Sequence, residues 1–443
     1  MTILQSLGRA RAMLLGGWLA VSGAMAADAA APLPEPLTLE YALSLAAEPH
    51  PALAISHAGV DASRAALAAA EARTDVSVTA EARARWIEPP DIAPERERDD
   101  HKASLFVRKN LYDFGRTSAF RAAAEAGVAR AESVYQDALA QRRIDIMARF
   151  FDVVLADLEF SREDEAMAVV YVTLDRLRQR HELKQISDVD LLAAEAEYQN
   201  VRRSRYAAEG RQRLTRAALA DALNRPGSLS SDLKRPDLAA AVSRALPEVE
   251  VLQEAASVRN PVLVGLRHAV RAAEERVLAA RADRRPRLVG ELEASQYSSE
   301  LASNDEWRAG VVLEIPLYTG GLVDSAVGQR QAELYETRSR LREAQMQLRH
   351  AVLELWLQLQ TLKVQREAAG VGRDYRELYL DRSRALYELE VNADLGDAMV
   401  RLTEAELAEV DTEFQTALAW ARLDALTGGP VAEQAAQETR EAP

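Results

Sequence analysis

Four short stretches of the chain alternate between apolar and polar residues. In the first, Val76, Val78 and Trp86 fall on one face, while Thr79 and Arg83 fall on the other. A period of two is typical of β-strands with one apolar and one wet face. The pattern therefore predicts four strands of about ten residues, in two pairs: about 76–86, 102–111, 287–297 and 307–317.

The rest of the pattern predicts long helices. Two stretches, about 116–185 and 322–390, contain almost no glycine or proline and are rich in Ala, Leu, Arg, Glu and Gln. At 1.5 Å per residue, helices of this length span roughly 100 Å. A second long helix follows each one, to about 223 and about 426, and Ala-rich helices at about 37–73 and 246–283 precede the strand pairs.

The order of these elements occurs twice along the chain. Asn110-Leu-Tyr-Asp-Phe-Gly115 returns as Pro316-Leu-Tyr-Thr-Gly-Gly321, and Glu182-Leu183 returns as Glu388-Leu389, in both cases about 206 residues later. A nearly constant offset indicates an internal duplication. We expect the repeats to cover 27–231 and 232–430, each with a helix, a β-hairpin and a long helical hairpin, followed by a tail at 431–443.

Residues 1–26 have the layout of a secretory signal peptide. Arg9 and Arg11 form a basic start, an apolar run follows, and Ala24-Met25-Ala26 provides a small-x-small end. The apolar run is shorter than the roughly 20 residues of a transmembrane helix. The sequence therefore predicts an exported protein whose signal is removed.

Composition excludes several function classes. With 69 acidic and 55 basic side chains and a formal charge of −14, the chain lacks the basic footprint of a nucleic-acid binder. The absence of cysteine excludes disulfides, thiolate metal sites and a lipidated N-terminal cysteine. The six histidines show no ligand spacing, and no phosphate-binding loop or catalytic constellation is present. We therefore expect no cofactor, no metal and no enzymatic activity.

Two structural interpretations of the strands stay open at this point. They could form the half-buried face of a soluble sandwich, but their length and their apolar–charged alternation also suit tilted membrane strands. Four strands cannot close a barrel, so the membrane interpretation requires several chains. The long helices could be a coiled coil or a soluble spacer.

Four motifs resemble the TolC-like family of outer membrane efflux proteins, the outer membrane factors, over essentially the whole mature chain. They are Leu37-Thr-Leu-Glu-Tyr-Ala-Leu with His50-Pro51, Asn110-Leu-Tyr-Asp-Phe-Gly-Arg116, Ser187-Asp-Val-Asp-Leu-Leu-Ala-Ala-Glu195, and Ile315-Pro-Leu-Tyr-Thr-Gly-Gly321. The resemblance implies a mainly α fold with membrane β-structure. In a homotrimer, four strands per chain would make a twelve-stranded barrel in the outer membrane. The helices would continue it as a coiled-coil tunnel through the periplasm.

The same resemblance implies a function and partners. The trimer would be the passive exit duct of a tripartite efflux or type I secretion system, in contact with outer-membrane lipid. A periplasmic adaptor (membrane fusion) protein and an inner-membrane transporter would deliver the substrate, whose identity the sequence does not reveal. The alternative is a soluble periplasmic coiled-coil scaffold or adaptor, which would lack membrane strands.

The resemblance also implies site residues. Asp394 and Asp397 match the family's Asp-x-x-Asp-Ala spacing at the periplasmic entrance, where six carboxylates in a trimer would form a cation-selective constriction; helix capping is the alternative role. The expected helical tips, where an adaptor would dock, contain Lys184, Ser187, Asp188, Asp190 and Glu390. The family often has glycine at these tips, and this chain does not. The strand-to-helix turns contain Asp113 and Gly115 in the first repeat and Gly320 and Gly321 in the second, so the two turns need not be identical.

Overall fold

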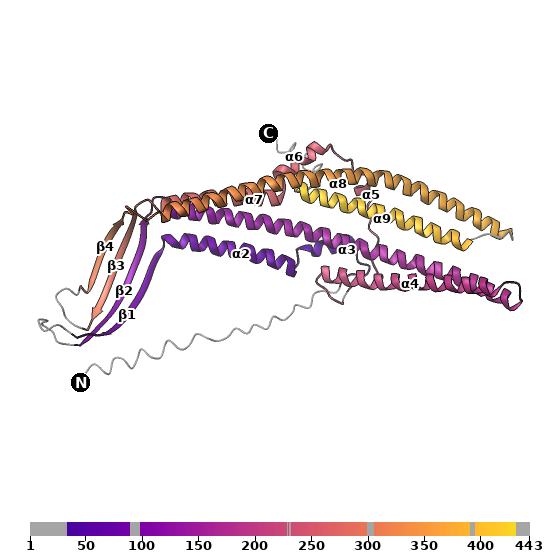
Figure 1. Cartoon of the computed structure of the whole chain (residues 1–443), viewed down its shortest axis with the longest axis horizontal. Coiled ribbons are helices and arrows are strands. Elements are labelled where there is room, and N and C mark those ends of the chain that lie inside the picture. Colours follow the sequence, from indigo (N-terminus) through magenta and orange to yellow (C-terminus); the bar gives the residue numbers. More distant parts are fainter. Residues whose placement is uncertain are drawn as a thin grey trace.

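The computed structural model describes residues 33–88, 98–227, 229, 232–298, 305–389 and 395–430. The predicted signal at 1–26 and the predicted tail at 431–443 lie outside these residues. The chain is elongated, with a β-sheet at one end and long helices running from it to the other end (Figure 1). The helices are α1 Leu39–Ser44, α2 Pro51–Glu71, α3 Arg116–Glu182, α4 Asp188–Ala222, α5 Ala239–Val242, α6 Val249–Arg259, α7 Pro261–Ala282, α8 Leu322–Glu388 and α9 Leu395–Thr427. Two short 3₁₀ turns, Leu45–Ala47 and Ala72–Thr74, follow α1 and α2.

The strands are β1 Val76–Trp86, β2 Asp99–Tyr112, β3 Arg287–Tyr297 and β4 Trp307–Glu314. They form one antiparallel sheet in the order β1-β2-β3-β4. The two predicted hairpins are therefore joined edge to edge through β2 and β3, with Leu105 opposite Ala294. The fourth strand ends at Glu314 rather than at the predicted Leu317, because Pro316 has no N–H to donate to a ladder.

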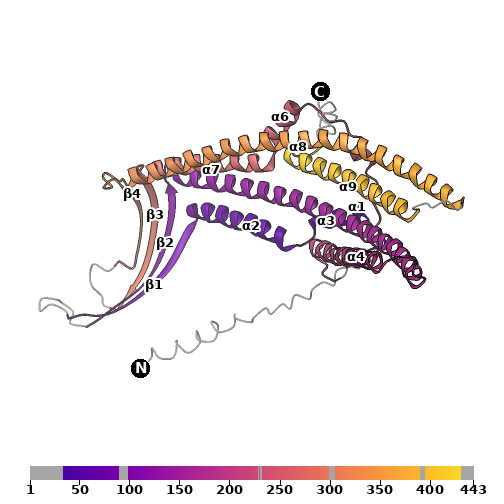
Figure 2. The ribbon, with the colours of Figure 1, turned by 45° about the vertical axis from the view of Figure 1, so that its right-hand side comes forward.

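The two longest helices, α3 and α8, have 67 residues each, and a short turn joins each of them to the sheet. Beside them, α2 and α7 occupy the half nearest the sheet, whereas α4 and α9 occupy the far half (Figures 1 and 2). Both α7 and α9 contact α3 as well as α8, so the second repeat packs on the first along its length. The same order of elements thus appears in both halves of the chain.

The Ala-rich segments are each interrupted, where the sequence pattern predicts one continuous helix over 37–73 and another over 246–283. A proline begins the second part in both cases, because the missing N–H of a proline is harmless only in the first turn of a helix. The preceding side chain caps the new helix: His50 Nδ1 accepts from the Ala52 N–H at 3.1 Å, and Asn260 Oδ1 accepts from the Leu263 N–H at 3.1 Å.

The core of the described residues lies at mid-length, where the repeats meet. Phe151 of α3 stacks on Phe414 of α9 with ring centroids 4.2 Å apart, and both are buried. Around them lie Leu37, Ile146 and Leu219 from the first repeat. A second apolar cluster, around Leu252, Val352 and Trp420, joins α6, α8 and α9. These clusters fix the long helices relative to one another and so hold the sheet and the far helical ends at opposite ends of the molecule.

Candidate functional site

Both turns that lead from the sheet into a long helix use two successive left-handed residues. In the second repeat these are Gly320 and Gly321, with φ of 61° and 83°. In the first repeat the first left-handed residue is Phe114, with φ 52°, and the second is Gly115, with φ 96°. The single glycine of the first turn therefore does not change its backbone. The ring of Phe114 packs edge-on against Tyr112 at 4.6 Å, and its carbonyl accepts a 2.7 Å hydrogen bond from Arg285, contacts that offset the strain.

Asp113 ties the first turn to the start of α3. Its carboxylate accepts from the Thr117 N–H at 2.9 Å, from the Thr117 hydroxyl, and from the Asn110 amide at 3.0 Å. Burial raises the pKa of Asp113, but the bonds from Thr117 and Asn110 outweigh it and lower the pKa below its ordinary value. Asp113 thus caps the start of α3, a role that the sequence analysis did not assign to it.

A cavity of about 650 Å³ lies between the two turns, and arginines and acids both line it. Arg116 pairs with Asp283 at 2.7 Å, and Arg287 pairs with Glu314 at 2.5 Å. The local sequence pattern does not connect Arg287 with the turns. The ladder pairing of β3 with β4 is what places it opposite Glu314.

The tip between α3 and α4 is a compact, capped turn. Lys184 has φ 58°, the left-handed conformation that glycine adopts most readily, so this tip keeps a glycine-like backbone without a glycine. Ser187 and Asp190 cap α4 reciprocally: the Asp190 N–H donates to Ser187 Oγ at 3.2 Å, and the Ser187 N–H donates to Asp190 Oδ2 at 3.3 Å. The bonds from Ser187 lower the pKa of Asp190. His181 Nε2 lies 2.6 Å from Asp188 Oδ1, which fastens the end of α3 to the start of α4.

The tip of the second helical hairpin is only partly described. Glu390 and Asp394 lie outside the described residues, and α9 begins at Leu395. Asp397 is half-buried and accepts a 2.5 Å charged hydrogen bond from Arg401, one turn along α9. Sequence reasoning missed this partner, although the i, i+4 spacing indicates it. Because Asp394 lies outside the described residues, the pairing of Asp394 with Asp397 at an entrance stays a prediction.

Two contacts hold the start of α9 on α3. Gly396 approaches so closely that a Cβ there would lie 2.6 Å from Val169 Cγ1. About two turns further along α9, Thr403 donates a 2.9 Å hydrogen bond to Glu165. The position of Asp397 in the molecule therefore depends on the packing of α9 against α3.

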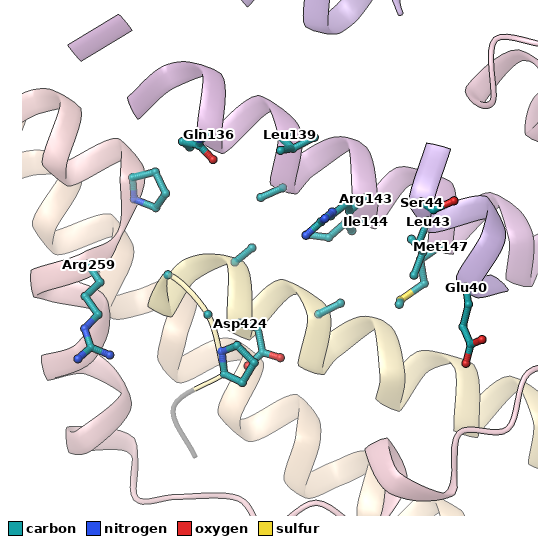
Figure 3. A pocket seen from close by; sticks show the side chains of 17 residues that line it. Glu40, Leu43, Ser44, Gln136, Leu139, Arg143, Ile144, Met147, Arg259 and Asp424 are labelled. Atoms are coloured by element: carbon teal, nitrogen blue, oxygen red, sulfur yellow. The ribbon is translucent and has the colours of Figure 1, made fainter. Parts of the chain in front are cut away.

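A second cavity, of about 680 Å³, lies at mid-length where the start of α7 approaches the end of α9 (Figure 3). Side chains of α1 and α3, among them Leu43 and Met147, face α9 across it (Figure 3). Asp424 in its wall is held by both Nη atoms of Arg244, at 2.8 and 2.9 Å. The sequence pattern gave no sign of this cavity, because distant segments form it.

The described residues contain neither a group of His, Asp and Glu side chains able to hold a metal ion nor a helix long and apolar enough to cross a membrane. What the molecule offers is an apolar-faced sheet, two fixed turns, and helical hairpins that end in capped or ion-paired tips.

Comparison with known proteins agrees with this architecture. Residues 251–429 match the model of the family described as outer membrane efflux protein. The resemblance to outer membrane efflux proteins is confirmed. The same match supports the outer-membrane location predicted from the sequence. No curated protein matches the chain in sequence.

Solved structures with the same fold include several outer-membrane proteins. VceC of Vibrio cholerae is 18% identical, with a TM-score of 0.70, over 88% of this chain and 96% of that one. The Campylobacter jejuni CmeC outer membrane channel is 15% identical, with a TM-score of 0.71, over 91% and 89%. The open-state MtrE outer membrane channel of Neisseria gonorrhoeae is 17% identical, with a TM-score of 0.70, over 88% and 89%. The predicted fold class is therefore confirmed: the chain has the fold of these outer-membrane proteins.

Proposed function

We propose that the protein is one subunit of a trimeric exit duct in the outer membrane. The observation that carries this proposal is the four-stranded sheet, whose outer strands β1 and β4 each pair on one side only. Backbone groups inside a bilayer must all be paired, so an open sheet is not viable there. Three copies joined β1 to β4 would give twelve strands and close the barrel.

The sheet also carries the apolar surface that a lipid-facing wall requires. Register places Val78 beside Val107, Val107 beside Leu292, and Leu292 beside Ala309, so one face of the four strands is mainly apolar, with Lys109 among its few polar residues. Trp86 and Trp307 on this face are 74% and 71% exposed. Apolar surface left in water costs about 25 cal/mol per Å², which favours burial of this face in lipid over the soluble scaffold.

The helices would continue the barrel as a periplasmic tunnel. In this proposal the α3–α4 tip with Lys184, Ser187, Asp188 and Asp190, and the second tip near Glu390, receive a periplasmic adaptor protein fed by an inner-membrane transporter. The duct passes substrate without chemistry.

We further propose that Asp394 and Asp397 narrow the entrance and select cations. Because Arg401 neutralises part of the charge on Asp397, the attraction for cations is weaker than six free carboxylates would give.

Membrane extraction tests the proposed duct, and conductance tests both the duct and its acidic entrance. The duct requires a protein that resists carbonate washing, dissolves in detergent as a trimer, and forms channels in planar bilayers. A monomer released by carbonate would contradict it.

For the entrance, the double variant Asp394→Ala/Asp397→Ala is expected to weaken block by multivalent cations. Asp411→Ala, about four turns further along α9, serves as the control and should leave the block unchanged. If the double variant is blocked as strongly as the Asp411→Ala control, the acidic entrance is refuted, whereas the proposed duct is not.

A further inference from the structure

The second face of the sheet is charged, and its charges are arranged unequally. In the proposed duct this face lines the lumen, because the opposite face is apolar; the inference that follows rests on that proposal. The described strands place these cations on it: Arg83, Arg85, Lys102, Arg108, Arg287 and Arg308. Its acids are Glu81, Asp100, Glu291, Glu293 and Glu314.

In most ion pairs of this face the basic side chain is more exposed to solvent than the acidic side chain. Arg308 pairs with Glu293 at 2.6 Å, yet its side chain is 62% exposed and that of Glu293 only 11%. The Arg85 side chain is 56% exposed, whereas its partner Asp100 is 22% exposed. Arg108 is likewise more exposed than Glu291, to which it pairs at 3.1 Å. Among the ion pairs that the described residues of this face form, only Arg287 with Glu314 lacks a cation more exposed than its acid.

Glu293 pairs with two cations at once. Its carboxylate accepts from Lys102 Nζ at 2.8 Å, from Arg308, and from Ser295 Oγ at 2.8 Å. One carboxylate thus faces two cations that belong to β2 and β4, on either side of β3. The remaining positive charge has no second acid among the described residues of this face.

The described strands give this face a small positive excess, although the whole chain is acidic. The described polar face holds one more cation than acid in each chain, against a net charge of −14 for the full sequence. In a trimer the excess is tripled and concentrated in a narrow space with apolar walls behind it. Exposed charges at a constriction set the local concentration of mobile ions.

We propose that the barrel lumen is an anion-favouring segment, in which Arg83, Arg85, Arg108 and Arg308 attract solutes that carry a carboxylate or phosphate group. The exported substrates that this segment favours are accordingly small anionic or zwitterionic molecules. An acidic entrance and a basic exit would act on different parts of the same path.

Two neighbouring residues of β2 provide a matched test. Arg108 lies on the charged face, opposite Ser77 and Glu291, whereas Lys109 lies on the apolar face, opposite Val76. Arg108→Gln and Lys109→Gln therefore remove the same charge from adjacent positions on opposite sides of the wall. Arg308→Gln is a second lumen variant, and it leaves Lys102 in place to pair with Glu293.

The assay is the reversal potential of purified full-length channels in planar bilayers under a KCl gradient. Arg108→Gln and Arg308→Gln are expected to lower the permeability of chloride relative to potassium about two-fold or more at low salt, with a smaller effect at high salt. Lys109→Gln is expected to leave the ratio unchanged.

Equal ratios in wild type and both lumen variants would overturn the inference, as would a shift in Lys109→Gln as large as that in Arg108→Gln. A wild-type protein that forms no channel at all would instead overturn the proposed duct, so the two failures are distinguishable.

Discussion

Gly396 offers the sharpest perturbation of the helical end. It is the second residue of α9, and its backbone lies against the side chain of Val169 on α3. A methyl group added there would lie 2.6 Å from Val169 Cγ1 and 2.8 Å from Cγ2. Carbon atoms in contact sit about 3.5–4.0 Å apart, so Gly396→Ala requires α9 and α3 to separate by roughly 1 Å.

Two opposing effects set the free-energy cost of Gly396→Ala. Alanine favours the helix over glycine by about 1 kcal/mol, whereas overpacking of a close contact costs about 1–3 kcal/mol. The net loss of α9–α3 attachment is therefore about 0–2 kcal/mol, and about 1.4 kcal/mol shifts an equilibrium tenfold. Because the strain is local to the start of α9, it should move that end outward rather than unfold the chain. In the proposed duct this widens the entrance beside Asp397.

Single-channel recording measures the effect directly. Gly396→Ala is expected to raise the conductance or the open fraction, and the added change Val169→Ala, which removes both clashing methyl groups, is expected to restore wild-type behaviour. Gly370→Ala is the control, since a Cβ at Gly370 in α8 would meet nothing within 4 Å. Wild-type recordings from Gly396→Ala, or a widened channel that Val169→Ala does not restore, would refute this reasoning.

Three further predictions concern the tips. Lys184→Gly should stabilise the α3–α4 turn by about 1 kcal/mol, because glycine adopts the left-handed conformation without strain, and slower amide exchange at the turn would show it. The lowered pKa of Asp190 means that its cap is fully effective above the ordinary aspartate pKa and is lost as the pH falls through the lower folded value. Amide exchange in the first turn of α4 should therefore accelerate in acid, and Asp190→Asn, which still allows Ser187 to cap, should abolish that dependence. Arg401→Gln frees the carboxylate of Asp397, so block by multivalent cations should strengthen; unchanged block would place Asp397 away from the entrance.

Sequence reasoning located the regular elements well for a physical reason. Alternation of apolar and polar residues and long uninterrupted helical composition are local signals, so β1 and β3 begin and end where the pattern predicts. The breaks before Pro51 and Pro261 were missed because the surrounding residues favour helix on both sides of them.

The sites were less predictable because they depend on long-range packing. The pairing of β2 with β3 brings Lys102 to Glu293, residues from different repeats, and no local pattern encodes it. The left-handed backbone of Phe114 and Lys184 was also missed, since neither residue type signals it. The roles assigned to Asp397 and to the tip residues stay predictions, and Glu390 and Asp394 lie outside the described residues.

Cross-linking between copies tests the central claim most directly. The chain has no cysteine, and β1 and β4 lie at opposite edges of its own sheet, so a disulfide between them must join two chains. Thr79→Cys would be combined in turn with a cysteine at each position of β4 and oxidised in outer membranes. Thr79→Cys with Phe106→Cys, paired within the sheet, would confirm that oxidation works. The account predicts that at least one β1–β4 pair yields covalent trimers; membrane-inserted protein that stays monomeric with every pair would contradict it.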